Sequence, residues 1–160
     1  MLILFFTGIV LITVLDQLTK LMAVRGLVEI VTIPLIEDIF HLTYCENKGA
    51  GFGVFSNHTW LLSIVTILIV AAAIVYVFVK RPKEKLLNVA VTFMIGGAVG
   101  NLIDRIRLGY VVDFLDFRWI NFPIFNIADC FITVGAIILA VYVIFFSDKK
   151  EQTDGDNKSS

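Results

Sequence analysis

The chain has 160 residues, of which 58% are apolar, and its mean hydropathy is +0.89. Soluble domains contain about 45–50% apolar residues, so this composition excludes an ordinary soluble domain and indicates an integral membrane protein. The formal net charge of -1 offers no basic surface of the kind that binding to nucleic acid requires.

The first predicted span covers residues 2–24, an apolar segment interrupted by Asp16, Gln17 and Lys20. Together with Thr13 these residues recur at helical spacing, so we expect one polar stripe that faces protein rather than lipid. Asp16 and Lys20 are also spaced for an i, i+4 ion pair, and a structural and a functional role both stay open. No basic region precedes the span and no small-residue cleavage site follows it, which favours a retained helix over a signal peptide.

Residues 25–59 contain no run long enough to span a bilayer. Alternating apolar and polar residues over 28–33 and 39–46 predict short strands at the membrane surface. The glycine-rich sequence that follows lacks the spacing of a phosphate-binding loop and predicts a tight hairpin. His41 and His58 stand in no metal-ligand spacing, so we expect ordinary loop residues.

Three further spans are predicted over residues 60–79, 86–103 and 127–146. The basic loop of residues 80–85 marks a cytoplasmic connection by the positive-inside rule, which places both termini in the cytoplasm. The polar segment 148–160 is expected to be a disordered cytoplasmic tail.

Gly96 and Gly100 have the GxxxG spacing that brings membrane helices into close contact, so we expect a helix to pack closely there.

Cys45 and Cys130 follow no zinc or redox motif. We interpret them as free thiols, with a disulfide as the alternative.

Polar residues concentrate near one end of the predicted spans and in the outer segment 104–126. A rise of about 1.5 Å per residue places Asp16, Asn101 and Asp129 at similar heights toward the outer leaflet, where the segment with Asp113 also arrives. Inserting a carboxylate near the bilayer centre costs about 2.5–3.5 kcal/mol. This clustering therefore indicates one site at the outer boundary of the membrane.

Carboxylates are the main catalytic groups at this site, because the sequence has no HExxH, GxSxG or SxxK motif. Two aspartates that share one proton can activate water to hydrolyse a peptide with neither a metal nor a nucleophilic serine, and Asp113 and Asp129 are the candidate pair. Purely structural roles for these carboxylates are equally compatible with the sequence. Asn126 and Asp129 can form a helix capping box. Asp113 and Asp116 can pair at the membrane surface with Arg105, Arg107 or Arg118.

The sequence resembles the bacterial lipoprotein signal peptidases, also called signal peptidase II, over nearly all of the chain from Asp16 to Asp129. Only Gly51 departs from the family pattern, which more often has alanine there. The matching motifs are DQLTK at 16–20, NKGAGFG at 47–53, GGAVGNLIDR at 96–105, VVDFLDF at 111–117 and FNIAD at 125–129.

The resemblance implies an α-helical intramembrane aspartic peptidase: four transmembrane helices, a small extracytoplasmic β-sheet cradle and an outer surface helix, in one domain over residues 1–147. It implies that Asp113 and Asp129 are the catalytic dyad and that Asp16 and Lys20 support the structure around them. The residues that would bind substrate or orient the dyad are Asn47, Gly49, Asn101, Arg105 and Asn126.

The resemblance also implies a substrate and a location. The substrate is a prolipoprotein whose cysteine already carries diacylglycerol, and cleavage occurs immediately before that cysteine. The enzyme is expected to act as a monomer in the bacterial cytoplasmic membrane, in contact with lipid, and to use no cofactor and no metal.

Two other classes stay open from the residues alone. A small proton-coupled transporter would relay protons through Asp16, Asp113 and Asp129, and a noncatalytic scaffold would tolerate other polar groups at these positions. A transporter needs polar residues through the full depth of the membrane, whereas the cytoplasmic halves of these spans are almost wholly apolar.

Overall fold

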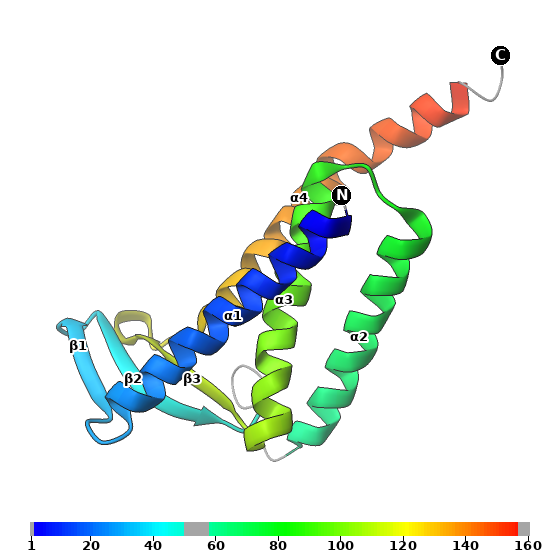
Figure 1. Ribbon diagram of the computed structural model, residues 1–160. Helices are drawn as coiled ribbons and strands as arrows, with labels where there is room; N and C mark the ends of the chain where they lie inside the picture. The colour runs from blue at the N-terminus through cyan, green and yellow to red at the C-terminus, as the bar shows by residue number, and fades with distance from the viewer. Residues whose placement is uncertain (1, 50–57, 157–160) are drawn as a thin grey trace.

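The computed structural model describes residues 2–49 and 58–156, with side chains described as far as residue 146. Four of its helices are long and apolar enough to cross a membrane, and a small three-stranded sheet lies at one end of them (Figure 1). The predicted fold class is confirmed. The elements in order are α1 Leu2–Leu27, β1 Thr32–Ile36, β2 Phe40–Asn47, α2 Thr59–Lys80, α3 Lys85–Leu108, β3 Val111–Phe117, the 3-10 helix η2 Arg118–Ile120, and α4 Ile127–Asp156.

Helix α3 is the centre of the bundle and contacts α1, α2 and α4. Its glycines permit this, because a Cβ at Gly96 would lie 2.8 Å from Cβ of Ile12 on α1. A Cβ at Gly100 would overlap the carboxylate of Asp16, also on α1. The close helix contact predicted from the GxxxG spacing is therefore confirmed.

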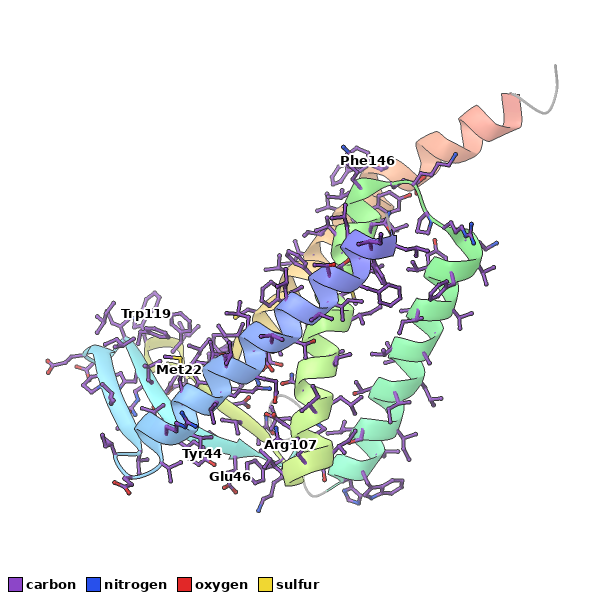
Figure 2. The ribbon with its side chains drawn as sticks, viewed as in Figure 1. Met22, Tyr44, Glu46, Arg107, Trp119 and Phe146 are labelled. Atoms are coloured by element: carbon purple, nitrogen blue, oxygen red, sulfur yellow. The ribbon has the colours of Figure 1, made fainter. Side chains whose placement is uncertain are left out.

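Apolar side chains cover the outside of the helices as well as filling the interior. Figure 2 shows Met22, Trp119 and Phe146 directed outward, and Trp119 is 76% exposed. Lipid is the solvent that suits such a surface, because it solvates apolar groups. The polar residues Asp16 and Lys20 are buried instead, so the predicted polar stripe faces protein.

The sheet is antiparallel in the order β1-β2-β3 and packs against the end of α1. Ala23 and Leu27 of α1 form a buried cluster with Val112 and Phe114 of β3. Cys45 lies opposite Asp113 in the β2–β3 register. The packing thus fixes β3 to the end of the helix bundle.

Several predicted boundaries differ from the structure. Helix α1 continues to Leu27, so the strand expected from residue 28 begins at Thr32. Helix α3 continues past 103 to Leu108, because arginine is a good helix former, and it ends at Gly109, whose φ of 80° suits a left-handed cap.

The outer segments and the tail differ as well. The segment 104–126 contains strand β3, and His41 lies buried on β2 rather than in a loop. The tail predicted to be disordered from residue 148 continues α4 to Asp156, since no helix breaker occurs before Gly155. Within the described part of segments 25–59 and 104–126, η2 is the one helix apart from the ends of the spanning helices. The implied surface helix has no other counterpart there, and Gly51 with its neighbours 50–57 lies outside the described residues.

Candidate active site

Two aspartates from different elements face one cavity. Asp113 lies in the middle of β3 and Asp129 in the first turn of α4, and both line a cavity of about 460 Å³. The lining residues are Asn47, Gly49, Asn101, Arg105, Val111, Asp113, Phe122, Pro123, Ile124, Phe125, Asp129, Cys130, Thr133 and Val134. The structure therefore brings together most of the site residues predicted from the sequence.

Asparagine side chains hold the carboxylate of Asp113. Nδ2 of Asn126 donates to its Oδ1 over 2.6 Å, and Nδ2 of Asn47 donates to its Oδ2 over 2.8 Å. The side-chain oxygen Oδ1 of Asn47 accepts a hydrogen bond from the N–H of Gly49, and this bond fixes the orientation of the Asn47 side-chain amide. No arginine pairs with Asp113 among the described residues, whereas Asp116 forms the ion pair with Arg118 that the structural alternative predicted.

Asp129 is part of a capping box at the start of α4. Its N–H donates to Oδ1 of Asn126 over 3.0 Å, and the N–H of Asn126 donates to Oδ2 of Asp129 over 3.2 Å. The second carboxylate oxygen, Oδ1, accepts Nδ2 of Asn101 over 2.8 Å. The capping box predicted as the structural alternative is present, and the same carboxylate also faces the cavity.

Burial and charge change the acidity of Asp113, which is 1% exposed. Removal from water, and secondly the negative charge of Asp129, raise the pKa of Asp113 to about 7. The hydrogen bonds from Asn47 and Asn126 act in the opposite direction because they favour the ionised form. A carboxyl group that holds a proton near neutral pH, beside a second carboxyl group, is suited to general acid and base chemistry.

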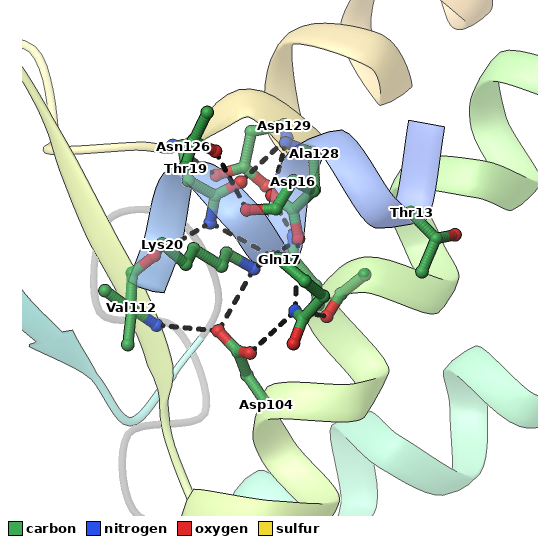
Figure 3. Close-up of polar contacts among 12 residues, drawn as sticks. Thr13, Asp16, Gln17, Thr19, Lys20, Asp104, Val112, Asn126, Ala128 and Asp129 are labelled. Atoms are coloured by element: carbon green, nitrogen blue, oxygen red, sulfur yellow. Dashed lines mark hydrogen bonds and ion pairs between the residues drawn. The ribbon is translucent and has the colours of Figure 1, made fainter. Parts of the chain in front are cut away.

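Lys20 forms the centre of a buried polar network between α1 and α3 (Figure 3). Its ammonium lies 2.9 Å from Oδ2 of Asp16, 3.1 Å from Oδ2 of Asp104 and 2.8 Å from Oδ1 of Asn101. The ion pair of Asp16 and Lys20 expected from their spacing is thus present. Asn101 connects this network to the cavity through its bond to Asp129.

Two members of the network, Asp104 and Gln17, are absent from the predicted site residues. Nε2 of Gln17 donates to Oδ1 of Asp104 over 2.9 Å and to the carbonyl oxygen of Gly100 over 3.1 Å. The signal that could have identified Asp104 is its position three residues after Asn101, on the same face of the helix.

Arg105 contributes a free hydrogen-bond donor to the cavity. Its Nε is buried and has no hydrogen-bond partner among the described residues. The wall near it carries the apolar side chains of Phe122, Ile124 and Val134. The cavity therefore combines acids, one free guanidinium donor and an apolar surface.

The described residues form no metal-binding cluster, and both cysteines are unpaired. Within residues 2–49 and 58–146, no group of three or more His, Cys, Asp or Glu side chains is placed to hold a metal ion. Cys45 and Cys130 are free thiols, as predicted.

Comparison with known proteins places these features in a family. The family model described as signal peptidase (SPase) II matches residues 8–145. A lipoprotein signal peptidase from Caldanaerobacter subterraneus subsp. tengcongensis is 49% identical over 132 residues, which cover 82% of this chain and 89% of that protein. One from Clostridioides difficile is 45% identical over 141 residues, which cover 88% of this chain and 95% of that protein.

A solved structure agrees with the sequence relatives. It is a bacterial membrane enzyme determined by the in meso method at 2.3 Å resolution, with a TM-score of 0.80 and 31% identity. The match covers 88% of this chain and 87% of that one. The similarity therefore covers most of the fold.

Proposed function

Because the chain belongs to the signal peptidase II family of aspartic peptidases, it is a membrane endopeptidase that cleaves lipoprotein signal peptides, and we propose that Asp113 and Asp129 are its catalytic dyad. The observation that carries this proposal is that both carboxyl groups face one cavity and share Asn126 as a partner. Each aspartate also keeps a second amide partner, so the two orientations are fixed before substrate binds.

The dyad holds one proton between its two carboxyl groups. Burial and the charge of Asp129 raise the pKa of Asp113 to about 7, so Asp113 is the member that carries the proton. The ionised Asp129 takes a proton from a water molecule, and the resulting hydroxide attacks the scissile carbonyl carbon. The protonated Asp113 donates a hydrogen bond to the carbonyl oxygen. Transfer of a proton to the leaving nitrogen then breaks the peptide bond.

The neighbouring polar groups have separate tasks. Asn126 is buried and orients both aspartates, whereas Asn101 and Asn47 each orient one of them. The free Nε of Arg105 is a donor for a backbone carbonyl of the substrate. Gly49 lines the cavity without a side chain, which leaves room for an extended peptide.

A diacylglyceryl-modified precursor suits the apolar part of the cavity. Phe122, Ile124 and Val134 provide apolar wall, and Val134 is 44% exposed on the outer surface of α4. Acyl chains attached to the substrate can therefore stay in contact with lipid while the peptide reaches the acids. A signal peptide is itself an apolar helix, so both parts of this substrate arrive from the membrane.

The arrangement of the helices supports the predicted orientation. The start of α1, the far end of α4 and the α2–α3 connection lie at one end of the bundle, and the sheet lies toward the other (Figure 1). The cavity is lined by Val111 and Asp113 of β3, and so lies toward the sheet. The connection carries the basic residues of 80–85, which favours the cytoplasmic side. Both termini are then cytoplasmic, and the site lies toward the outer leaflet of the cytoplasmic membrane. A single chain supplies every group that the mechanism uses, so the enzyme can act as a monomer.

The proposal is tested with purified protein in detergent and a diacylglyceryl-modified precursor. Asp113→Asn and Asp129→Asn should each reduce cleavage by at least about 1,000-fold, because each removes one acid or base from the reaction. The matched control is Asp38→Asn, which changes an exposed carboxylate with a φ of 58° that asparagine also tolerates. It should retain full activity.

Two outcomes would contradict the proposal. Activity retained in either dyad variant would remove that residue from the mechanism, and equal cleavage of an unlipidated precursor would remove the lipid from substrate recognition. Proton uptake by sealed vesicles that is lost in the same variants would favour the transporter alternative.

A further inference from the structure

The buried network contains one cation whose hydrogen bonds are all used. Lys20 is 3% exposed, and its ammonium has three N–H groups. They meet Asp16 on its own helix and Asp104 and Asn101 on α3. The position of the ammonium therefore determines where two carboxylates lie.

Each of these carboxylates holds a backbone N–H next to one member of the dyad (Figure 3). Oδ1 of Asp16 accepts the N–H of Ala128 over 3.0 Å, and Ala128 directly precedes Asp129. Oδ2 of Asp104 accepts the N–H of Val112 over 3.1 Å, and Val112 directly precedes Asp113. The same relation thus occurs twice, once on each side of Lys20.

We propose that Asp104 is a positioning residue for Asp113 and that Lys20 couples it to Asp16, which positions Asp129 in the same way. This inference rests on the proposed dyad. The network acts on the backbone that carries the dyad, and Asn101 adds a direct bond from the network to the side chain of Asp129.

Packing and strand pairing hold β3 against the bundle, and Asp104 adds a bond close to Asp113. Strand β3 pairs with β2 on one side, and its residue Leu115 bridges to Phe125 on the other. Asp104 supplies the bond to Val112 from α3, outside the sheet. Without that bond, the part of β3 that carries Val112 and Asp113 could shift relative to α3, and a displacement of about 1 Å at a reacting group can cost about 100-fold in rate.

Stability is a weaker explanation for the network. Burying an ammonium and two carboxylates carries a desolvation cost that offsets much of their attraction. An apolar cluster of similar volume would serve stability as well. The specific bonds to Ala128 and Val112 are what an apolar cluster cannot provide.

The test is Asp104→Asn in the full-length protein. Asparagine has nearly the same shape but one acceptor oxygen, so it cannot accept from Gln17 on one side and from Val112 and Lys20 on the other. We expect kcat to fall about 10–100-fold while KM stays within about threefold. Hydrogen exchange at the Val112 amide should become faster, because a neutral amide oxygen accepts this bond more weakly than a carboxylate does.

Asp116→Asn is the matched control. Asp116 is also buried on β3, but its partners are Arg118 and Thr43, both in the sheet region. It should lower the unfolding temperature without the fall in kcat. Equal loss of kcat in both variants, or an unchanged kcat and Val112 exchange in Asp104→Asn, would overturn the proposal.

Two further measurements test the network: a variant of Asp16, and amide hydrogen exchange in the unsubstituted protein. Asp16→Asn tests the other half of the network, and it should lower kcat and accelerate exchange at Ala128. In the unsubstituted protein the Val112 and Ala128 amides should exchange slowly, and fast exchange at either would overturn the proposal even if no variant folds. Failure of the dyad itself would appear separately, as activity retained in Asp113→Asn.

Discussion

The side chain of Asn126 joins the two aspartates: its Nδ2 lies 2.6 Å from Oδ1 of Asp113, and its Oδ1 accepts the N–H of Asp129. One residue is therefore both the cap of α4 and a partner of the acid on β3. Capping and orientation are separable, because the oxygen caps the helix and the nitrogen contacts Asp113. This separation gives the first prediction.

Asn126→Ser should keep the helix cap and lose the contact with Asp113. Serine is a good N-cap residue, so the unfolding temperature should stay close to that of the unsubstituted protein. Loss of the amide donor should lower kcat by about 10–100-fold. Asn126→Ala is the comparison, and it should lose a further 1 kcal/mol or so of stability because the cap is absent. Full activity in Asn126→Ser would show that the amide does not orient the dyad.

Activity should depend on the proton that Asp113 holds. With its pKa raised to about 7 by burial and by Asp129, kcat/KM should fall by about tenfold per pH unit above that value. The measured pKa belongs to the pair of aspartates rather than to one of them. A value of kcat/KM that stays constant between about pH 6 and about pH 9 would contradict a shared proton.

Stability should respond to the same group with a definite sign. Burial and the charge of Asp129 raise the pKa of Asp113 from its ordinary value of 3.8 to about 7 in the folded protein, so the folded state binds more protons than the unfolded state between these two values. The contribution of Asp113 to stability is then full at low pH and is lost as pH rises from about 4 toward about 7. The unfolding temperature of Asp113→Asn, measured over that range, should lack this part of the decrease.

Gly97 should be intolerant of a side chain because α3 and α4 touch there. A Cβ would overlap the carbonyl oxygen of Ala128 and lie 2.9 Å from Cγ1 of Ile132. Gly97→Ala should cost about 1–3 kcal/mol through overpacking and displace the start of α4, which carries Asp129. The control is Gly26→Ala, where no atom lies within 4 Å of the added Cβ, and it should be neutral or slightly stabilising. Equal unfolding temperatures in the two variants would contradict this role of Gly97.

The sequence predicted the helices well because their signal is strong and local. Long apolar runs identified all four spans, and polar positions on α1 identified its buried face through Asp16 and Lys20. Strand β3 was missed as a strand because VVDFLDF places two aspartates in a short segment. Its pairing with β2 depends on contacts between residues distant in the chain.

The site was predicted as a set of residues but not as a network. Depth along the helices explains why Asp16, Asn101 and Asp129 meet, since helical rise fixes their heights. The bonds of Asp16 to Ala128 and of Asp104 to Val112 involve backbone N–H groups. Backbone donors carry no residue type that a sequence pattern can reveal, so this part required the structure.

Arg105 supplies the last prediction, because its Nε has no hydrogen-bond partner among the described residues. Arg105→Lys keeps the positive charge near the dyad and replaces the planar guanidinium with an ammonium, so its effect measures the placement of the Nε donor rather than the charge. A hydrogen bond from a charged group contributes about 1.5–3 kcal/mol, and kcat/KM should therefore fall by about 10–100-fold, mainly through a higher KM. Arg107→Lys is the control, because Arg107 is exposed on the same helix and does not line the cavity. If Arg105→Lys behaves like Arg107→Lys, the free Nε does not bind substrate.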